Sequence, residues 1–459
     1  MVSGLLLWPA GLEAAVVLAL VLPFASVVLL RLLSVAALVA PPRSDAAASN
    51  TAPRLPDAAL PTYAVLVPLY DEAAIVPGLV TALGRLDYPL DRLAISFVLE
   101  AHDRETRSAF AATALPPHMR VIIVPPGEPR TKPRALNAAL AATDGDFVVV
   151  YDAEDLPEPD QLRLAVAAFS ASPAEVVCLQ ARLNTFNPAE SWLARQFTIE
   201  YSALFDVLLP ALERFGLPVP LGGTSNHFRR SALESSLSWD PFNVTEDADL
   251  GVRLARFRMK VGVLDSTTWE EAPSTFRIWQ GQRTRWLKGW MQTYLVHMRS
   301  PRRLRDELGW WQFIGVQLLM GSMIASALVH PWFYVLLAID AWRGSAFAWP
   351  SGGIAVGFWW LAVTNLLLGY ATAVFIGAIA VWRRKRIWLL PSVLLVPVYW
   401  LLISWSAYRA LRELAIAPYH WEKTLHRAHS VVVVRRGGER FACIGSTQQE
   451  HRLDQSQPS

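Results

Sequence analysis

The segment Phe147-Val-Val-Val-Tyr151, followed at once by Asp152-Ala153-Glu154-Asp155, joins an apolar run to three carboxylates. A short apolar run bounded by polar residues is typical of a strand buried inside a parallel sheet. Polar groups directly after such a strand lie at the carboxyl edge of the sheet, where doubly wound α/β folds bind their ligands. This segment therefore predicts a fold class and also the edge at which a site should lie.

Apolar runs alternate with longer mixed segments on both sides of this strand. The strand-helix-strand rhythm is typical of an α/β fold with a mostly parallel, doubly wound sheet. The expected elements are strands over 63–68, 93–99, 121–124 and 147–151, and helices over 74–86 and 134–142. The polar residues that follow the strands are Tyr70-Asp71-Glu72, Glu100-Ala101-His102-Asp103 and the three carboxylates of 152–155.

Asp152, Glu154 and Asp155 would repel one another unless protons or a cation intervened. Mg²⁺ or Mn²⁺ bridging a nucleotide diphosphate is the natural neutraliser at such a place. The alternative is an acidic loop that caps a helix expected over 161–169. The sequence contains neither GxGxxG nor GxxxxGK[ST], so Rossmann dinucleotide chemistry and P-loop phosphoryl transfer have no support.

Three further segments carry polar groups suited to a phosphate or a sugar. Lys132 precedes a predicted helix and could hold a phosphate as a point charge, or else is a solvated lysine on a loop. The loop 220–226, with Gly223 and Thr224, lets a ligand approach the backbone closely, or is a plain turn. In Thr245-Glu246-Asp247 a carboxylate could act as a general base, whereas the alternative is the N-cap of the following helix.

The segment Gln280-Gly281-Gln282-Arg283-Thr284-Arg285-Trp286 gathers two glutamines, two arginines and an indole. The arginines form a donor array suited to a diphosphate, and the indole offers an aromatic face to a sugar ring. The surrounding stretch, 269–305, is dense in aromatic and basic residues, which indicates an amphipathic segment on the inner face of a membrane. An anchor without a catalytic part is the alternative, and both descriptions can hold together.

The composition points to a membrane protein. Of the 459 residues, 53% are hydrophobic and 18% are charged, so part of the chain is expected in lipid. Apolar segments at 14–40, 313–339 and 354–382 are long enough to span a bilayer. The net charge of +3 gives no reason to propose nucleic acid as a partner.

Basic residues orient these segments. Arg31, Arg43 and Arg54 lie late in or after the first span, which places the following domain in the cytoplasm. A cleaved signal peptide is the alternative, but no Lys or Arg precedes the apolar core. The basic run 383–386 is likewise expected inside the cell. The segment 388–408 is either one more crossing or, because it contains two prolines, a broken or re-entrant segment.

These observations predict an organisation along the chain and a location. We expect a plasma membrane of the bacterial inner-membrane type. The predicted units are an N-terminal transmembrane helix at 1–40, a linker at 41–61, a cytoplasmic α/β domain at 62–300, a C-terminal transmembrane region at 306–416 and a cytoplasmic, partly disordered tail at 417–459.

In the order and spacing of its motifs, the chain resembles the processive, membrane-bound family 2 glycosyltransferases, the group that contains cellulose, chitin and hyaluronan synthases. The motifs are Pro68-Leu-Tyr-Asp-Glu72, the segment from Lys132 to Asn137, the DxD-like Asp152-Ala-Glu154, Thr-Glu-Asp247, and Gln282-Arg-Thr-Arg-Trp286, which matches the Q(Q/R)xRW signature. The resemblance implies a GT-A-like nucleotide-sugar-binding domain inserted between transmembrane helices.

The resemblance also implies roles for individual residues. Tyr70 and Glu72, with Glu100 or Asp103, would bind the nucleoside of the donor, and Lys132 and Asp152 would meet its diphosphate. Asp152 and Glu154 would hold Mg²⁺ or Mn²⁺, although Asp155 leaves the second ligand open. Asp247, beside Glu246, would deprotonate the acceptor hydroxyl. The diphosphate and the acceptor would be contacted by Gly223, Thr224, Gln282, Arg283, Arg285 and Trp286.

Three functions remain in view. The first is an inverting synthase that extends a β-linked, glucan-like polymer from a UDP-sugar, with UDP-glucose favoured, and passes it across the membrane. Its partners would be the growing glycan and membrane lipid, with any partner subunit unknown. The second is a non-processive transferase that moves one sugar to a lipid carrier. The third, a transporter or receptor, predicts ionisable residues inside the spans, and these are scarce apart from Arg31 and His330.

Overall fold

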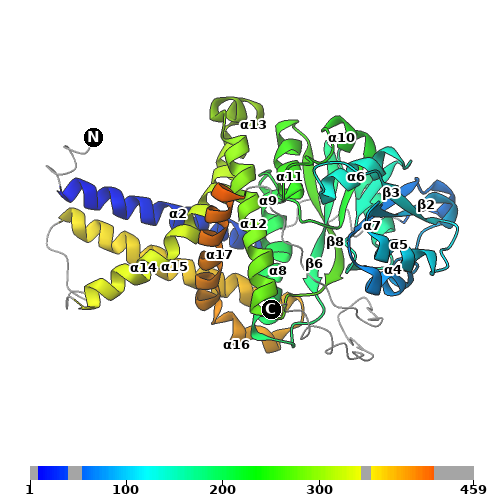
Figure 1. Cartoon of the computed structure of the whole chain (residues 1–459). Helices are drawn as coiled ribbons and strands as arrows, with labels where there is room; N and C mark the ends of the chain where they lie inside the picture. Colours follow the sequence, from blue (N-terminus) through cyan, green and yellow to red (C-terminus); the bar gives the residue numbers. More distant parts are fainter. Residues whose placement is uncertain (1–8, 40–53, 343–352, 418–459) are drawn as a thin grey trace, which may run out of the picture.

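The computed structural model describes residues 9–39, 54–342 and 353–417 (Figure 1). Within these residues an eight-stranded sheet has the order β3-β2-β1-β4-β7-β6-β8-β5. Most of the predicted linker and nearly all of the predicted tail lie outside the described residues. The strands are β1 (Tyr63–Leu69), β2 (Leu93–Glu100), β3 (Met119–Val124), β4 (Phe147–Val150), β5 (Leu156–Pro157), β6 (Val176–Thr185), β7 (Asn226–Arg229) and β8 (Lys260–Glu270).

Strands β3, β2, β1 and β4 are parallel, as the sequence pattern predicts. Their side chains alternate between two apolar cores, because successive residues of a strand point to opposite faces. One core contains Val65 and Val67 and is covered by α4, α5 and α7, and the other contains Leu66 and is covered by α6 and α11. These helices are α4 (Val76–Leu83), α5 (Arg104–Ala111), α6 (Lys132–Ala141), α7 (Gln161–Ala171) and α11 (Glu246–Arg256).

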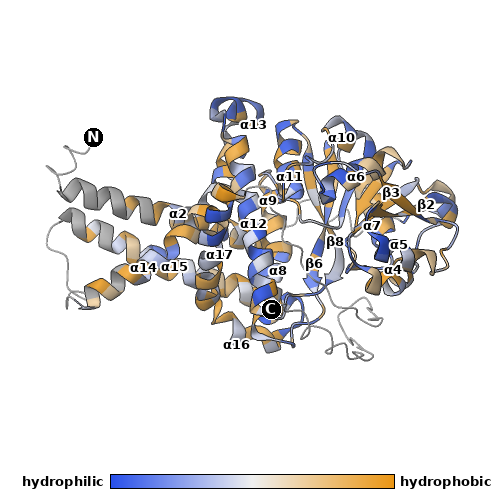
Figure 2. Ribbon diagram, in the orientation of Figure 1, coloured by the Kyte–Doolittle hydropathy of each residue, from blue (hydrophilic) through white to orange (hydrophobic). Residues whose placement is uncertain are grey.

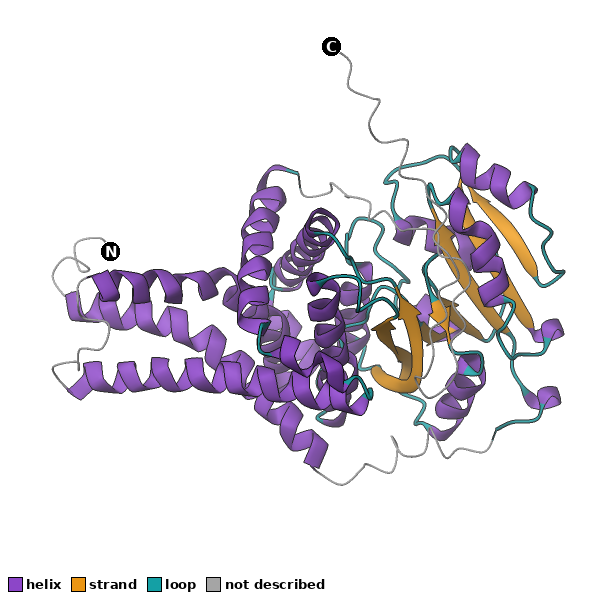
Figure 3. Cartoon of the chain, turned by 90° about the horizontal axis from the view of Figure 1, so that it is seen from below, coloured by secondary structure: helices purple, strands orange, loops and turns teal. Residues whose placement is uncertain are grey.

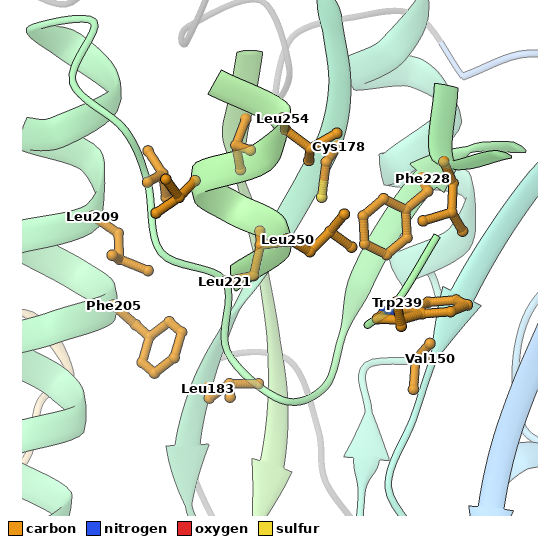
Figure 4. Packing of buried hydrophobic residues seen from close by; sticks show 14 of the residues in the cluster. Val150, Cys178, Leu183, Phe205, Leu209, Leu221, Phe228, Trp239, Leu250 and Leu254 are labelled. Atoms are coloured by element: carbon orange, nitrogen blue, oxygen red, sulfur yellow. The ribbon is translucent and has the colours of Figure 1, made fainter. Parts of the chain in front are cut away.

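The other half of the sheet is mixed. Strand β7 is antiparallel to both β4 and β6, β8 is parallel to β6, and β5 is antiparallel to β8. Helix α11 packs on this half through an apolar cluster that includes Leu250, Leu254 and Phe228 (Figure 4). This packing fixes the helix whose first turn contains Glu246 and Asp247. The remaining helices around the sheet are α8 (Trp192–Ala203), the π-helical η4 (Leu204–Leu208), α9 (Leu209–Arg214) and α10 (Arg230–Ser235).

Helices α2, α14 and α15 project together from the end of the molecule opposite β2 and β3 (Figure 1). Figure 3 shows from below that this bundle is separate from the strands. Three described helices are long and apolar enough to cross a membrane, or up to four if a bent pair counts as one span. The elements are α2 (Pro9–Val39), α12 (Phe276–His297), α13 (Pro301–Val316), η5 (Gln317–Gly321), α14 (Ser322–Trp342), α15 (Gly353–Arg383), α16 (Leu390–Val393) and α17 (Val396–Ile416).

The bent pair corresponds to the segment 388–408, which the sequence predicts to be either one more crossing or a broken or re-entrant segment. Residues 387–393 and 396–416 are bent by 64° at a short break, and α16 and α17 each begin with a proline in the first turn. Helix α17 runs beside α12 and across the direction of α2, α14 and α15 (Figure 1). The segment is therefore broken, as one of the two descriptions predicts.

Both α2 and α15 end against the sheet domain. Val35 and Leu38 near the end of α2, and Ile376 in α15, pack with Val207 of η4. The two helices run parallel, because Asn365 donates to the Val21 carbonyl at one level while Ile376 lies near Val35 further along. The run 383–386 consequently lies on the same side of the bundle as the sheet.

Candidate active site

Lys132 starts α6 and points to the carboxyl edge of the sheet. Its Nζ donates to the Asp152 carboxylate and, at 2.7 Å, to the Gly223 carbonyl. Burial alone would lower the pKa of Lys132, but Asp152, Glu246 and Asp247 raise it above its usual value. Lys132 is therefore a permanent cation that joins the end of β4 to the loop before β7, not a solvated lysine.

Gly223 lies where the predicted residues converge. A Cβ atom at this position would be 3.5 Å from Asp247 Oδ2, 3.8 Å from Lys132 Nζ and 3.9 Å from Asp152 Oδ2. Two helix starts and the segment after β4 thus meet within a few ångströms of one backbone position. The missing side chain leaves space beside a cation and two carboxylates, which is the space a small polar ligand needs.

The three carboxylates after β4 have different environments. Asp155 is buried, and its Oδ2 accepts from the Asp152 backbone N–H at 2.7 Å and from the Thr224 hydroxyl. Burial, followed by the charges of Asp152 and Glu154, raises the pKa of Asp155 well above its usual range. Asp155 therefore ties two loops together inside the domain, and Asp152 and Glu154 remain half-buried at the edge.

Glu246 and Asp247 occupy the first turn of α11. Thr245 precedes them, but its side chain makes no capping hydrogen bond to the helix, so the simple N-cap explanation fails for Thr245. Asp247 Oδ1 accepts from the Ala248 N–H at 2.8 Å. Burial raises the pKa of Asp247 to about 6 and that of Glu246 to about 7, while Lys132 acts in the opposite direction on both.

Helix α12 passes directly over this turn. A Cβ atom on Gly289 would lie 2.4 Å from Thr245 Cγ2, so the close approach requires glycine. Arg285 of α12 is near enough to Asp152, Glu246, Glu154 and Asp247 for their charges to oppose the lowering of its pKa by burial. Arg285 thus joins the group around Gly223.

Arg283 has other partners although it belongs to the same motif. Its guanidinium donates to both carboxylate oxygens of Glu200, at 2.8 and 2.6 Å, and to the Tyr399 hydroxyl at 3.0 Å. Trp286 packs against Phe197 and Tyr201, with ring centroids 5.9 and 6.3 Å apart. Gln282 is half-buried on the same helix. A contact of Arg283, Trp286 or Gln282 with a diphosphate or acceptor stays a prediction.

The loops after β1 and β2 are joined on the other side of Asp152. Asp103 Oδ2 accepts from the Asp71 N–H at 2.6 Å, and the Glu72 N–H donates to Thr106. Glu100 forms an ion pair with Arg134 at 3.2 Å. The exposed Tyr70 ring lies 5.5 Å from the His102 ring. Glu100 and Asp103 both have partners within the protein, so which of them contacts a nucleoside stays a prediction.

Two features of the site were not predicted. Glu270, at the end of β8, is close to Glu154 and hydrogen-bonds Tyr201, and burial raises its pKa well above the usual range. The loop after α15 docks on the domain, because Arg384 donates to both oxygens of Asp206 and Arg386 bonds Asn184 and Thr185. The available signal for Glu270 was a long mixed stretch that ends in a pair of carboxylates, Glu270-Glu271, whereas nothing local marks the docking.

Comparison with solved structures identifies the class of fold. A mannosyltransferase, PcManGT from Pyrobaculum calidifontis, in complex with GDP-Man and Mn²⁺, superposes with a TM-score of 0.53 at 20% identity. The match covers 84% of this chain and 98% of that chain. The mixed sheet with carboxylates after β4 is thus a GT-A-like domain, flanked by apolar helices.

Comparison with sequences gives the family. Residues 61–289 match the model described as glycosyltransferase like family 2, and the chain belongs to this family. The probable glycosyltransferase YdaM of Bacillus subtilis is 28% identical over 233 residues, which are 50% of this chain and 55% of that protein.

Two further relatives differ in the acceptors that their names state. The beta-monoglucosyldiacylglycerol synthase of Synechocystis sp. is 31% identical over 269 residues, 57% of this chain and 55% of that protein. A probable glucomannan 4-beta-mannosyltransferase of Arabidopsis thaliana is 26% identical over 239 residues, 50% of this chain and 43% of that protein. The chain spans about half the length of the curated relatives it matches.

Proposed function

We propose that the protein is an inverting glycosyltransferase that moves a hexose from a nucleotide sugar to an acceptor hydroxyl at the membrane surface. The observation that carries this proposal is the convergence of Lys132, Asp152, Asp247 and Arg285 around Gly223. Two cations suit a departing diphosphate, and the Asp247 carboxylate close to them suits an acceptor hydroxyl. The beta linkages in the names of two relatives agree with inversion of an α-linked donor.

Asp247 is the base in this proposal. Its carboxylate lies beside the open position at Gly223, and its raised pKa makes it a better proton acceptor than an exposed aspartate. Glu246 sits next to it with a pKa that is raised further, which keeps negative charge from accumulating in the pocket at neutral pH. Lys132 and Arg285 would stabilise the charge that develops on the diphosphate as the bond to the sugar breaks.

The donor set fits a divalent cation. Burial, and then the charges of Asp152 and Glu154, raise the pKa of Asp155 and of Glu270, so negative charge is concentrated at this edge of the sheet. Among the described residues no group of three or more acidic, His or Cys side chains is gathered tightly enough to hold a metal alone. Mg²⁺ typically takes one or two carboxylates and completes its shell with substrate phosphates. Asp152 and Glu154 would hold Mg²⁺ or Mn²⁺, which would polarise the diphosphate, and excess EDTA should abolish transfer.

The donor is proposed to be a UDP-sugar, with UDP-glucose favoured. The joined loops after β1 and β2 would receive the uridine, because Tyr70 offers an exposed ring beside the half-buried Glu72. The acceptor is proposed to be a growing β-linked glycan. Trp286 of the Q(Q/R)xRW segment supports a glycan acceptor. Its indole lies on the same helix as Arg285 and borders the rings of Phe197 and Tyr201 on α8, and aromatic faces of this kind pack well against sugar rings.

Transfer of a single sugar to a membrane lipid is the second candidate. It is favoured by the relative named as a beta-monoglucosyldiacylglycerol synthase, which is 31% identical to this chain. In both cases the catalytic domain would face the cytoplasm, with α2, α14 and α15 in a plasma membrane of the bacterial inner-membrane type. If α17 lies beside α12 at the membrane surface, three crossings would leave the domain and the end of α17 on one side.

The deciding experiment supplies radiolabelled UDP-sugars, with Mg²⁺ or Mn²⁺, to inverted membrane vesicles that contain the protein. Label in high-molecular-weight, alkali-stable material supports the polymer, and linkage-specific hydrolases then name the bond. Label confined to organic-extractable lipid supports the second candidate. If the protein is present in the vesicles and folded, as judged by its melting temperature, a lack of incorporation from every nucleotide sugar would contradict the proposed activity.

A further inference from the structure

Arg31 lies in the apolar helix α2, inside a segment long enough to span a membrane. Its Nη1 donates to the Gly369 carbonyl of α15 at 3.0 Å, and its guanidinium carbon stands 4.4 Å from the centre of the Trp400 ring of α17. Three helices that are distant in sequence thus meet at one arginine. A charged side chain inside a membrane span is costly and commonly marks a functional position.

The charge of Arg31 has no acidic counterpart among the described side chains. The groups that meet this guanidinium are the Gly369 carbonyl and the indole face of Trp400. A guanidinium has five N–H donors in a planar fork, so one carbonyl bond leaves most of its capacity unused. The side chain is only partly buried, so a ligand can approach it.

A second polar group beside Arg31 is incompletely bonded. His330 of α14 is 2% exposed, and its Nε2 shares a hydrogen bond of 3.0 Å with the Tyr370 hydroxyl. Its other ring nitrogen, Nδ1, is buried without a partner. The His330 and Tyr370 rings both pack against Trp400, at 5.8 and 5.6 Å between centroids. Arg31, His330 and Tyr370 therefore surround one indole, and we call these four residues the junction cluster.

The junction cluster lies near the end of the apolar helices that meets the catalytic domain, and we place the lipid headgroups at this level. Val35, one helical turn after Arg31, already packs against Val207 of the catalytic domain. On the neighbouring helices Trp332 and Tyr408 are exposed and hydrogen-bonded to each other at 2.8 Å. Exposed Trp and Tyr side chains are typical of the boundary between hydrocarbon and water. The cluster is thus reachable from the bilayer and close to the catalytic domain.

We propose that the junction cluster binds the phosphate group of a membrane lipid. The planar fork of Arg31 would bind two phosphate oxygens, and His330 Nδ1, when it carries the proton, would donate a third bond while the Tyr370 hydroxyl stays on Nε2. A lipid phosphate is favoured over a soluble anion because apolar spans surround the cluster. The site is separate from the group around Gly223, so the inference does not depend on the proposed transfer reaction.

Lipid binding can be measured without turnover. The full-length protein is purified in detergent and incubated with phosphatidylglycerol, with a polyprenyl phosphate or with zwitterionic phosphatidylcholine, and bound lipid is counted by native mass spectrometry. We expect retention of an anionic lipid by the wild type and a loss of affinity of about tenfold or more in Arg31→Gln, since bonds to a charged group are lost. Preference for the polyprenyl phosphate over phosphatidylglycerol would identify a lipid carrier as the ligand. Equal binding of these two lipids would identify a site for anionic membrane lipids in general.

Two variants make the result specific. Arg302→Gln removes the same charge from an exposed position at the start of α13 and should retain the lipid. Arg31→Lys keeps the charge but not the fork and should bind with intermediate affinity. Melting temperature and nucleotide binding report whether each variant is folded. Equal lipid retention by wild type, Arg31→Gln and Arg302→Gln would overturn the proposal, and it would leave the proposed glycosyl transfer untouched.

Discussion

The two faces of α12 have opposite surroundings, although one five-residue motif, residues 282–286, supplies both. On one face Arg285 looks onto the carboxylates around Gly223. On the other face Arg283 is held by Glu200 and by Tyr399 of α17. A helix turns by about 100° per residue, so residues two apart point in nearly opposite directions. The comparison teaches that one signature can combine an arginine near the carboxylates of the proposed site with an arginine that fastens the domain to α17.

The face of α12 that carries Arg285, with the residues around Gly223, is called the catalytic face below. Replacement of the proposed base tests this face most strongly. Asp247→Asn should lower the transfer rate by about 10²–10⁴-fold, because it removes the proton acceptor, and should leave nucleotide binding nearly intact. The measurement is the initial rate with saturating donor, beside donor affinity from calorimetry. Asp144→Asn, at an exposed position, is the matched control. A variant at position 247 with wild-type turnover would refute the assignment of the base.

Removal of the catalytic-face arginine should affect both binding and rate. Arg285→Ala is expected to lower kcat/KM by about 10–100-fold, since one charge-assisted contact to the diphosphate is lost. The melting temperature should change little. Arg277→Ala, exposed in the first turn of α12, serves as the control. Unchanged kcat/KM in Arg285→Ala would remove the distinction between the two faces.

Removal of the other arginine should affect stability first. Arg283→Ala breaks a bidentate ion pair whose arginine side chain is 9% exposed, and the expected loss is on the order of 2 kcal/mol in the free energy of unfolding. Thermal unfolding of Arg283→Ala, Glu200→Ala and the double variant gives the coupling energy between the two residues. Additive effects would show that the pair contributes nothing of its own, and an unchanged melting temperature would contradict its structural role.

The pH dependence sharpens the description of the catalytic face. A base acts in its ionised form, so activity is retained above its pKa and lost as pH falls through it. Burial raises the pKa of Asp247 from 3.8 to about 6, so kcat/KM should decline below about pH 6. A profile that stays level down to pH 4.5 would assign proton removal to another group.

The parallel half of the sheet could be predicted from sequence, because local patterns determine it. Apolar runs of strand length and the helices between them identify β1 to β4 without knowledge of distant contacts. The antiparallel β7 and the parallel pair β6 and β8 could not be predicted in this way. Their partners are set by packing across the whole domain, as in the cluster of Leu250 and Phe228.

The site was predictable in part for the same reason. Polar residues after each strand mark the carboxyl edge, and this rule identifies Asp152. Lys132 and Asp247 are singled out by the helix starts that they precede, and their roles are implied by the resemblance to family 2 glycosyltransferases. Their distances depend on Gly223 and Gly289, which carry no side chain and give little signal. The separation of Arg283 from Arg285 depends on Glu200 and Tyr399, which lie far away in the sequence.

The docking of the loop after α15 has a practical consequence for protein production. Asp206 takes its bidentate partner from Arg384, and Trp279 donates to the Tyr399 hydroxyl at 2.9 Å. A truncated chain that ends with the family-matching residues 61–289 would lack Arg384 and Tyr399 and would stop in the middle of α12. The part of the chain that folds together is therefore larger than the family-matching segment, and an expressed protein should include the residues through α17 that make these contacts.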